Sequence, residues 1–318
     1  MPALTALPTP DALHPLDLAL GAAALVCALA AVLGRTRRAA TTAFLTLGVV
    51  LALVWLRLGS VDVALAEAGL GTAVLAAVLV WVAVRTPEPD GAAPAPTGRA
   101  GRAALAAVTG AVAVLGIAAL WTRAEQAAPA WSGPLATRLP ETGVEHGVTA
   151  VLLGFRAYDT LLESAVLMLA GLAALAIGTS GGPGLTAVPP RITGMPATAL
   201  RVLAPALLLL GLWLVFAGSS GPGGAFQSGA VFAGLLVLLH LSGVRVPGLR
   251  RLLAPALVVG VLVFLAAAVP GVAGSPAWLD WSAGPTFALV LTVELSLTLG
   301  ITAGLYALFL ALEEDPHA

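Results

Sequence analysis

The chain has 318 residues, of which 59% are hydrophobic and only 10% are charged, and its formal net charge is -1. About a quarter of the residues of a soluble domain are charged, whereas apolar runs of roughly 20 residues, long enough to cross a bilayer, recur along this chain. The composition excludes a soluble globular protein, gives no basic footprint for nucleic acid, and predicts an all-α, polytopic membrane protein.

Missing residue types narrow the function further. All 15 basic residues are arginine, so the lysine that a phosphate-binding P-loop requires is absent. The single cysteine, Cys27, excludes a disulfide, a CxxC redox pair and an iron–sulfur cluster within the chain. The four histidines are scattered and offer no paired ligands. The sequence therefore predicts no cofactor, no metal site and no enzyme activity of its own.

About nine spanning helices are expected, at residues 16–33, 39–57, 62–84, 103–122, 158–178, 199–217, 225–242, 252–269 and 285–311. Two stretches rich in proline and glycine, 85–102 and about 178–196, have the composition of flexible linkers. They predict three modules: three helices within 1–90, two within 103–180 and four within 197–318.

The arginines predict the orientation of these helices. With the N-terminus outside and nine crossings, four arginines lie outside (Arg57, Arg123, Arg138, Arg156) and eleven inside (Arg35, Arg37, Arg38, Arg85, Arg99, Arg102, Arg191, Arg201, Arg245, Arg250, Arg251). This bias follows the positive-inside rule. It predicts a protein of the cell membrane whose C-terminus lies on the cytoplasmic side.

The third predicted helix carries two acids. Asp62 starts that helix, where an acid favours the positive end of the helix dipole. Glu67 lies between one and two turns further in, with Ala64, Ala68 and Gly71 at helical spacing around it. Another helix or water could approach Glu67 closely, so it is either part of an ion path or a packing residue.

Three charges stand at the entrance of the fifth predicted helix. Arg156, Asp159 and Glu163 recur at spacings of three and four, which would place them on one helix face. Arg156 and Asp159 could be an ion pair at the membrane interface. Glu163 is followed almost entirely by apolar residues, so its side chain is expected to find a polar partner inside the protein.

The segment GSSGPGGAFQSG, which joins the sixth and seventh helices, allows two interpretations. It is either a tight extracellular turn or a broken entry segment packed against a partner subunit, with Gln227 and Ser228 reaching inward. Beyond it, His240 could titrate near neutral pH or simply be a satisfied interface residue. The stretches RVLAPAL from Arg201 and RLLAPAL from Arg251 repeat each other, by duplication or by chance.

Glu294 is the most deeply placed acid. It lies nine residues into the last helix, roughly 14 Å at 1.5 Å per residue, with Thr298 and Thr302 at the next two positions of a four-residue repeat. Placing an ionisable residue in the hydrocarbon core costs about 2.5–3.5 kcal/mol. A structural or functional role is therefore expected for Glu294. A protonatable carboxylate with hydroxyl neighbours suits a proton or Na+ relay, and a protonated glutamate bonded to a neighbouring helix is the alternative.

Three stretches resemble a known family, the Mrp-type multisubunit Na+/H+ antiporters. DVALAEAGLGTAVLAAVLVW and VTAVLLGFRAYDTLLESAVLMLAGLAAL are similar to two segments in the C-terminal region of the MrpA polypeptide. APALLLLGLWLVFAGSSGPGGAFQSGAVFAG resembles the MrpB polypeptide, although its QSG replaces a pair of glycines. The same modules occur in membrane-bound hydrogenases and resemble part of the membrane arm of respiratory complex I.

The resemblance implies a membrane subunit of a cation/proton antiporter in which the MrpA-like tail is fused to the MrpB-like region. Its partners would be other subunits, including an antiporter-like one that carries a lysine-based proton path, and Na+ and H+ would be the transported ions. Ion-pathway candidates are Glu67, Glu163, Glu294, Asp159, Arg156 and His240. The alternatives are a subunit of an ion-pumping hydrogenase or complex I-like oxidoreductase, or a scaffold that conducts nothing.

Overall fold

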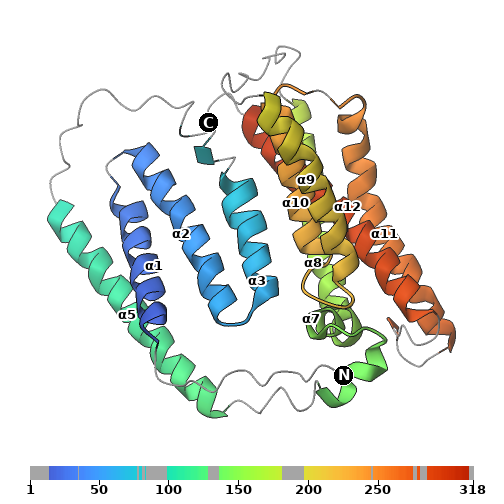
Figure 1. Cartoon of the computed structure of the whole chain (residues 1–318), viewed down its shortest axis with the longest axis horizontal. Coiled ribbons are helices and arrows are strands. Elements are labelled where there is room, and N and C mark those ends of the chain that lie inside the picture. Colours follow the sequence, from blue (N-terminus) through green and yellow to red (C-terminus); the bar gives the residue numbers. More distant parts are fainter. Residues whose placement is uncertain are drawn as a thin grey trace. The chain divides into compact units, whose positions relative to one another are not determined.

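The computed structural model describes residues 14–34, 36–76, 79–80, 83, 99–127, 136–180, 197–244, 246–274, 278–279 and 285–314. All regular structure within these ranges is helical, which confirms the all-α prediction (Figure 1). The two predicted linkers fall largely on residues 84–98 and 181–196, outside the described ranges. The chain divides into a larger unit, Met1–Thr86 with Pro140–Ala318, and a smaller one, Pro87–Leu139.

The larger unit begins with a pair of packed helices, α1 (Pro15–Leu33) and α2 (Arg37–Arg57). The start of α1 is fixed locally: Pro15 occupies the first turn, and the His14 side chain accepts a hydrogen bond from the Leu16 amide. Asp17 in that turn forms an ion pair with Arg57, with Oδ1 and Nε 2.9 Å apart. The two helices are therefore antiparallel.

The third predicted helix is not a uniform α-helix. An α-helical turn, α3 (Val61–Ala66), continues as a π-helix, η1 (Glu67–Val74). Two glycines lie in this wider stretch, and a Cβ on Gly69 would lie 3.2 Å from the Ala230 Cβ. The absence of side chains there allows η1 to pack closely on α10 (Ala225–Leu241).

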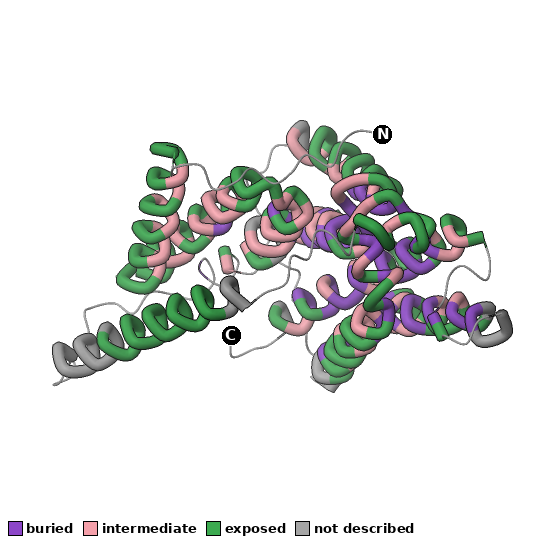
Figure 2. Tube along the Cα trace, turned by 90° about the horizontal axis from the view of Figure 1, so that it is seen from below, coloured by how far each residue is buried: buried purple, intermediate pink, exposed green. Residues whose placement is uncertain are grey.

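The remaining helices of the larger unit form a bundle of α8 (Ala157–Ser180), α9 (Ala197–Ala217), α10, α11 (Leu249–Gly274) and α12 (Thr286–Glu314). Helix α12 packs against α8, α10 and α11 and is the most buried of the long apolar helices. Figure 2 shows how buried residues gather in part of the molecule while other helices are exposed along much of their length.

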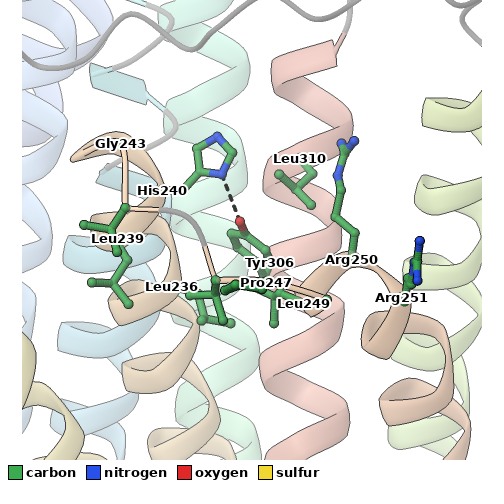
Figure 3. A pocket seen from close by; sticks show the side chains of 13 residues that line it. Leu236, Leu239, His240, Gly243, Pro247, Leu249, Arg250, Arg251, Tyr306 and Leu310 are labelled. Carbon is green, nitrogen blue, oxygen red and sulfur yellow. Dashed lines mark hydrogen bonds between the residues drawn. The ribbon is translucent and has the colours of Figure 1, made fainter.

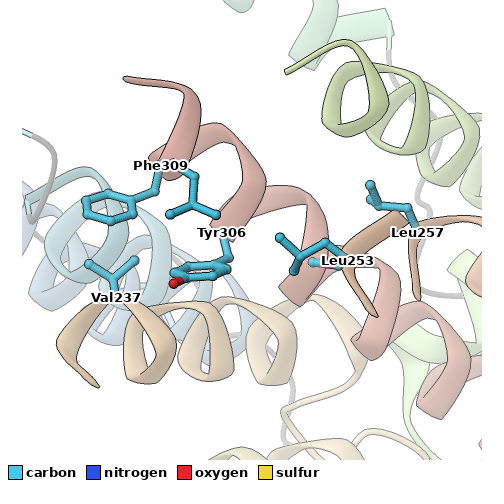
Figure 4. Packing of buried hydrophobic residues seen from close by; sticks show 7 residues of the cluster. Val237, Leu253, Leu257, Tyr306 and Phe309 are labelled. Atoms are coloured by element: carbon cyan, nitrogen blue, oxygen red, sulfur yellow. The ribbon is translucent and has the colours of Figure 1, made fainter. Parts of the chain in front are cut away.

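A cluster of buried side chains joins α10, α11 and α12 (Figure 4). Tyr306 and Phe309 stack with their ring centroids 6.2 Å apart, and Val237, Leu253 and Leu257 belong to the same cluster. Elsewhere along the bundle, α11 and α12 approach closely at glycines: a Cβ on Gly260 would lie 2.9 Å from the Ser296 carbonyl oxygen. Small residues and packed apolar side chains are how helices associate in a membrane.

A short helical segment that the sequence did not predict precedes α8. It consists of a 3-10 turn, η2 (Leu139–Thr142), one α-helical turn, α7 (Gly147–Thr149), and a second π-helix, η3 (Ala150–Phe155). The smaller unit contributes α5 (Arg99–Ala127), in which residues 108–123 are all exposed.

Six helices of the described part are long and apolar enough to cross a membrane: α1, α2, α8, α9, α11 and α12. Val108–Arg123 and Ala225–Leu241 are shorter apolar helices. Each of the nine predicted helices overlaps an observed helical segment, but the count of nine crossings and their orientation remain predictions.

Candidate functional site

A cavity of about 510 Å³ lies among α3, η3, α8, α10 and α12 of the larger unit. Three carboxylates from distant parts of the sequence line it: Asp62 on α3, Glu163 on α8 and Glu294 on α12. Gln227 and the hydroxyls of Thr149, Thr160 and Ser164 are its other polar side chains, and the rest of the wall is apolar. A few polar groups in an apolar cavity are typical of a site for a small ligand or ion.

Glu294 is the most enclosed of the three acids. Its side chain lies in the core of the bundle, and the residue is only 3% exposed. Among the described residues, Oε2 is buried and has no hydrogen-bond partner. The carboxylate lies against two glycines: a Cβ on Gly218 would be 2.8 Å from Oε1, and one on Gly224 would be 3.2 Å from it. An ionised carboxylate in such a place is costly unless a cation or a proton compensates its charge.

Thr298 and Thr302, which follow Glu294 along α12, were expected to be hydroxyl neighbours of its carboxylate, but their hydroxyls have other partners. Thr298 Oγ1 donates to the Glu294 carbonyl oxygen at 2.8 Å, and Thr302 Oγ1 donates to the Thr298 carbonyl oxygen at 2.7 Å. Both hydroxyls also lie within 3.5 Å of carbonyl oxygens on α10, those of Ala225 and Gly229. The hydroxyls are therefore bonded to the backbone of α12 and α10 and not to the carboxylate.

The turn between α9 and α10 covers the carboxylate. Gly223 and Gly224 have φ of +151° and +111°, which only glycine adopts readily, and the Gly224 amide donates to the Leu214 carbonyl oxygen at 2.8 Å. The segment before α7 holds the turn from its other side. The Glu145 and His146 amides donate to the Ser219 carbonyl oxygen at 3.0 and 3.1 Å, and Thr149 Oγ1 donates to the Gly218 carbonyl oxygen.

Gln227 and Ser228 are buried, as the second interpretation of this segment expected. Gln227 lines the cavity, and its Nε2 donates to the Asp62 carbonyl oxygen at 3.4 Å. The contacts described for the turn are with this chain itself, so its packing against a partner subunit stays a prediction.

Asp62 joins three segments and was missed as a site residue. Its Oδ2 lies 3.2 Å from His146 Nε2, and its Oδ1 accepts a hydrogen bond from the Gly223 amide at 3.1 Å. From the sequence, Asp62 is expected only to favour the helix dipole, and His146 has no expected role. No local pattern could have found this pair, because 84 positions separate the two residues.

The three charges near α8 do not act as one stack. Helix α8 begins at Ala157, so Arg156 precedes it. Arg156 and Asp159 form an exposed ion pair, with Nε and Oδ2 2.5 Å apart, as the interfacial interpretation expected. Glu163 lines the cavity but is exposed, and no hydrogen bond or ion pair links it to another described residue. The polar partner expected for Glu163 is therefore not found in the described part of this chain.

The other two candidates lie outside the cavity. Glu67 opens the π-helix η1, and its Oε1 would lie 2.8 Å from a Cβ on Gly71, so its side chain lies over that glycine. His240 lies at the end of α10, where Nδ1 is 2.9 Å from the Tyr306 hydroxyl, and lines a different cavity. The structure thus brings Glu163 and Glu294 together, with Asp62 as a third carboxylate.

Comparisons with known proteins agree with the sequence resemblance. Residues 22–88 match the family model of MbhD, the D subunit of MBH, and residues 195–312 match that of a domain related to the MnhB subunit of Na+/H+ antiporter. The fold matches a chain in the structure of the Mrp complex from Dietzia sp. DQ12-45-1b, with a TM-score of 0.75 and 24% identity. The match covers 98% of this chain and 36% of that chain. No curated protein matches.

Proposed function

We propose that this multi-pass membrane protein, which joins an MbhD domain to a domain related to MnhB, is one subunit of a multisubunit Na+/H+ antiporter. Its carboxylate-lined cavity would form part of the coupled ion route. The observation that carries the proposal is the convergence of Asp62, Glu163 and Glu294, from three separate helices, on one cavity of about 510 Å³.

The state of Glu294 supports an exchange mechanism. Its buried Oε2 has no hydrogen-bond donor among the described residues, so the ionised form needs a compensating charge. A proton and a sodium ion each supply that charge, and they exclude one another on the same carboxylate. Mutual exclusion at a shared acid is the condition for exchanging one ion for the other. Asp62, already bonded to Gly223 and paired with His146, would position the turn above this acid.

The chain would act with partners. It spans 36% of the chain that it matches in the Mrp complex. We infer that the complete activity needs further polypeptide. Other antiporter subunits, including one with a lysine-based proton path, would supply what this lysine-free chain lacks. The match of residues 22–88 to MbhD keeps a second function open, that of a membrane component of an ion-pumping oxidoreductase. Redox subunits that co-purify with the chain, or are encoded beside it, would favour that second function.

The experiment replaces Glu294 with Gln in the assembled complex. Glutamine keeps the shape of the side chain but carries no exchangeable charge, so we expect Na+-driven proton movement in inverted vesicles to fall about 100-fold, the lower range for losing a positioned proton-transfer group. The matched control is Glu141→Gln, because Glu141 is exposed in η2 and does not line the cavity. Both variants are checked for assembly by co-purification of the partner subunits. Full antiport by an assembled E294Q complex would exclude the exchange role and favour a scaffold that conducts nothing.

A further inference from the structure

A second cavity, of about 410 Å³, lies where α10 ends and α11 begins, beside the last turns of α12. Its polar lining consists of Arg250 and Arg251 at the start of α11 with His240 and Tyr306, which are joined by a hydrogen bond (Figure 3). The two arginine side chains extend in the same direction from α11 (Figure 3). The proposed ion route uses none of these residues.

The rest of the lining is apolar. Leu236, Leu239, Leu249 and Leu310 form its walls. The loop valines at its edge, Val244 and Val246, are 43% and 44% exposed. Helices α11 and α12 are both long enough to cross a membrane, and the cavity lies at their ends, so it belongs to the membrane–water interface. The cavity therefore offers cationic and hydrogen-bonding groups next to apolar surface at the level of lipid headgroups.

We propose that this cavity binds the phosphate headgroup of an anionic phospholipid. Guanidinium groups pair with phosphate through two parallel hydrogen bonds, and basic pockets between membrane helices are known to take acidic headgroups. The apolar walls would contact the glycerol and the first methylenes of the acyl chains. Inorganic phosphate has no apolar part that could contact these walls, so the proposed ligand is the lipid. The proposal is independent of the function proposed for the carboxylate cavity.

The test measures lipid retention by the full chain with native mass spectrometry, using phosphatidylglycerol and phosphatidylcholine with identical acyl chains. We expect the wild type to retain phosphatidylglycerol preferentially. Since each juxtamembrane arginine contributes about a factor of five, Arg250→Gln with Arg251→Gln should weaken that retention about 25-fold. Arg201→Gln is the matched control, because Arg201 begins the similar sequence RVLAPAL but does not line this cavity. The control should leave retention unchanged.

Two further arms keep the test decisive. The double variant Arg250→Lys with Arg251→Lys preserves charge and loses the bidentate geometry, so we expect retention between those of the wild type and the glutamine variant. An excess of inorganic phosphate should not displace the lipid. Displacement by phosphate, equal retention of the two lipids, or a glutamine variant that is monodisperse and retains lipid like the wild type would each overturn the proposal.

Discussion

At the scale of single residues, Asp62 links the amino-terminal and carboxy-terminal parts of the larger unit. Each carboxylate oxygen has a separate partner: Oδ1 accepts from the Gly223 amide, and Oδ2 faces His146 Nε2. The Asp62 and His146 side chains are only 13% and 16% exposed. Asp62 therefore holds the segment before α7 and the glycine turn together at the edge of the carboxylate cavity.

A double-mutant cycle tests this link. Asp62→Asn preserves an acceptor for the Gly223 amide but removes the charge that faces His146, and His146→Gln removes the imidazole. We expect the destabilisation by the two changes together to be about 1 kcal/mol smaller than the sum of the single effects, because either change alone already breaks the pair. Unfolding in mixed detergent micelles provides the free energies. Strict additivity would show that the contact contributes nothing.

At the scale of elements, the turn between α9 and α10 depends on glycines at defined positions. A Cβ on Gly218 would lie 2.5 Å from the Gly224 Cα and 2.8 Å from Glu294 Oε1, both closer than ordinary contacts. A Cβ on Gly221 would approach nothing more closely than 3.9 Å. Two glycines three positions apart in one turn thus have opposite tolerance for a methyl group.

Alanine at each position measures that difference. We expect Gly218→Ala to destabilise the protein by about 1–3 kcal/mol, as overpacking of a close contact does, and also to lower ion exchange by displacing the Glu294 carboxylate. Gly221→Ala should stay within about 0.5 kcal/mol of the wild type. Thermal unfolding and vesicle transport are measured on the same preparations. Equal effects of the two substitutions would contradict the packing described for Gly218.

At the scale of the whole larger unit, residues that the predicted topology assigns to one side of the membrane lie together. Asp62, at the start of α3, contacts His146 and Gly223, and nine alternating crossings put all three residues on the outer side. Arg250 and Arg251, which the same alternation puts inside, share a cavity at the ends of other helices with His240. The nine crossings and their orientation are predictions, and the orientation can be tested directly.

Cysteine labelling in whole cells supplies that test. In a Cys27→Ser background, Ser220→Cys places a thiol in the exposed part of the glycine turn, and Val244→Cys places one beside the arginine cavity. We expect a membrane-impermeant maleimide to label Ser220→Cys in intact cells and Val244→Cys only after permeabilisation. The opposite pattern would invert the orientation, and labelling of both in intact cells would contradict the alternation between these two loops.

The sequence by itself determined the class of the protein and the position of its long helices, because span length and hydrophobicity are local properties that a bilayer imposes on each segment. It also pointed to Glu163 and Glu294, since any acid within an apolar run needs an explanation. Only the tertiary structure decided that Asp62 shares their cavity, that His146 pairs with Asp62, and that Glu67 and His240 lie elsewhere. These relations depend on how helices separated by up to about 230 positions pack against one another, and neither periodicity nor composition records that packing.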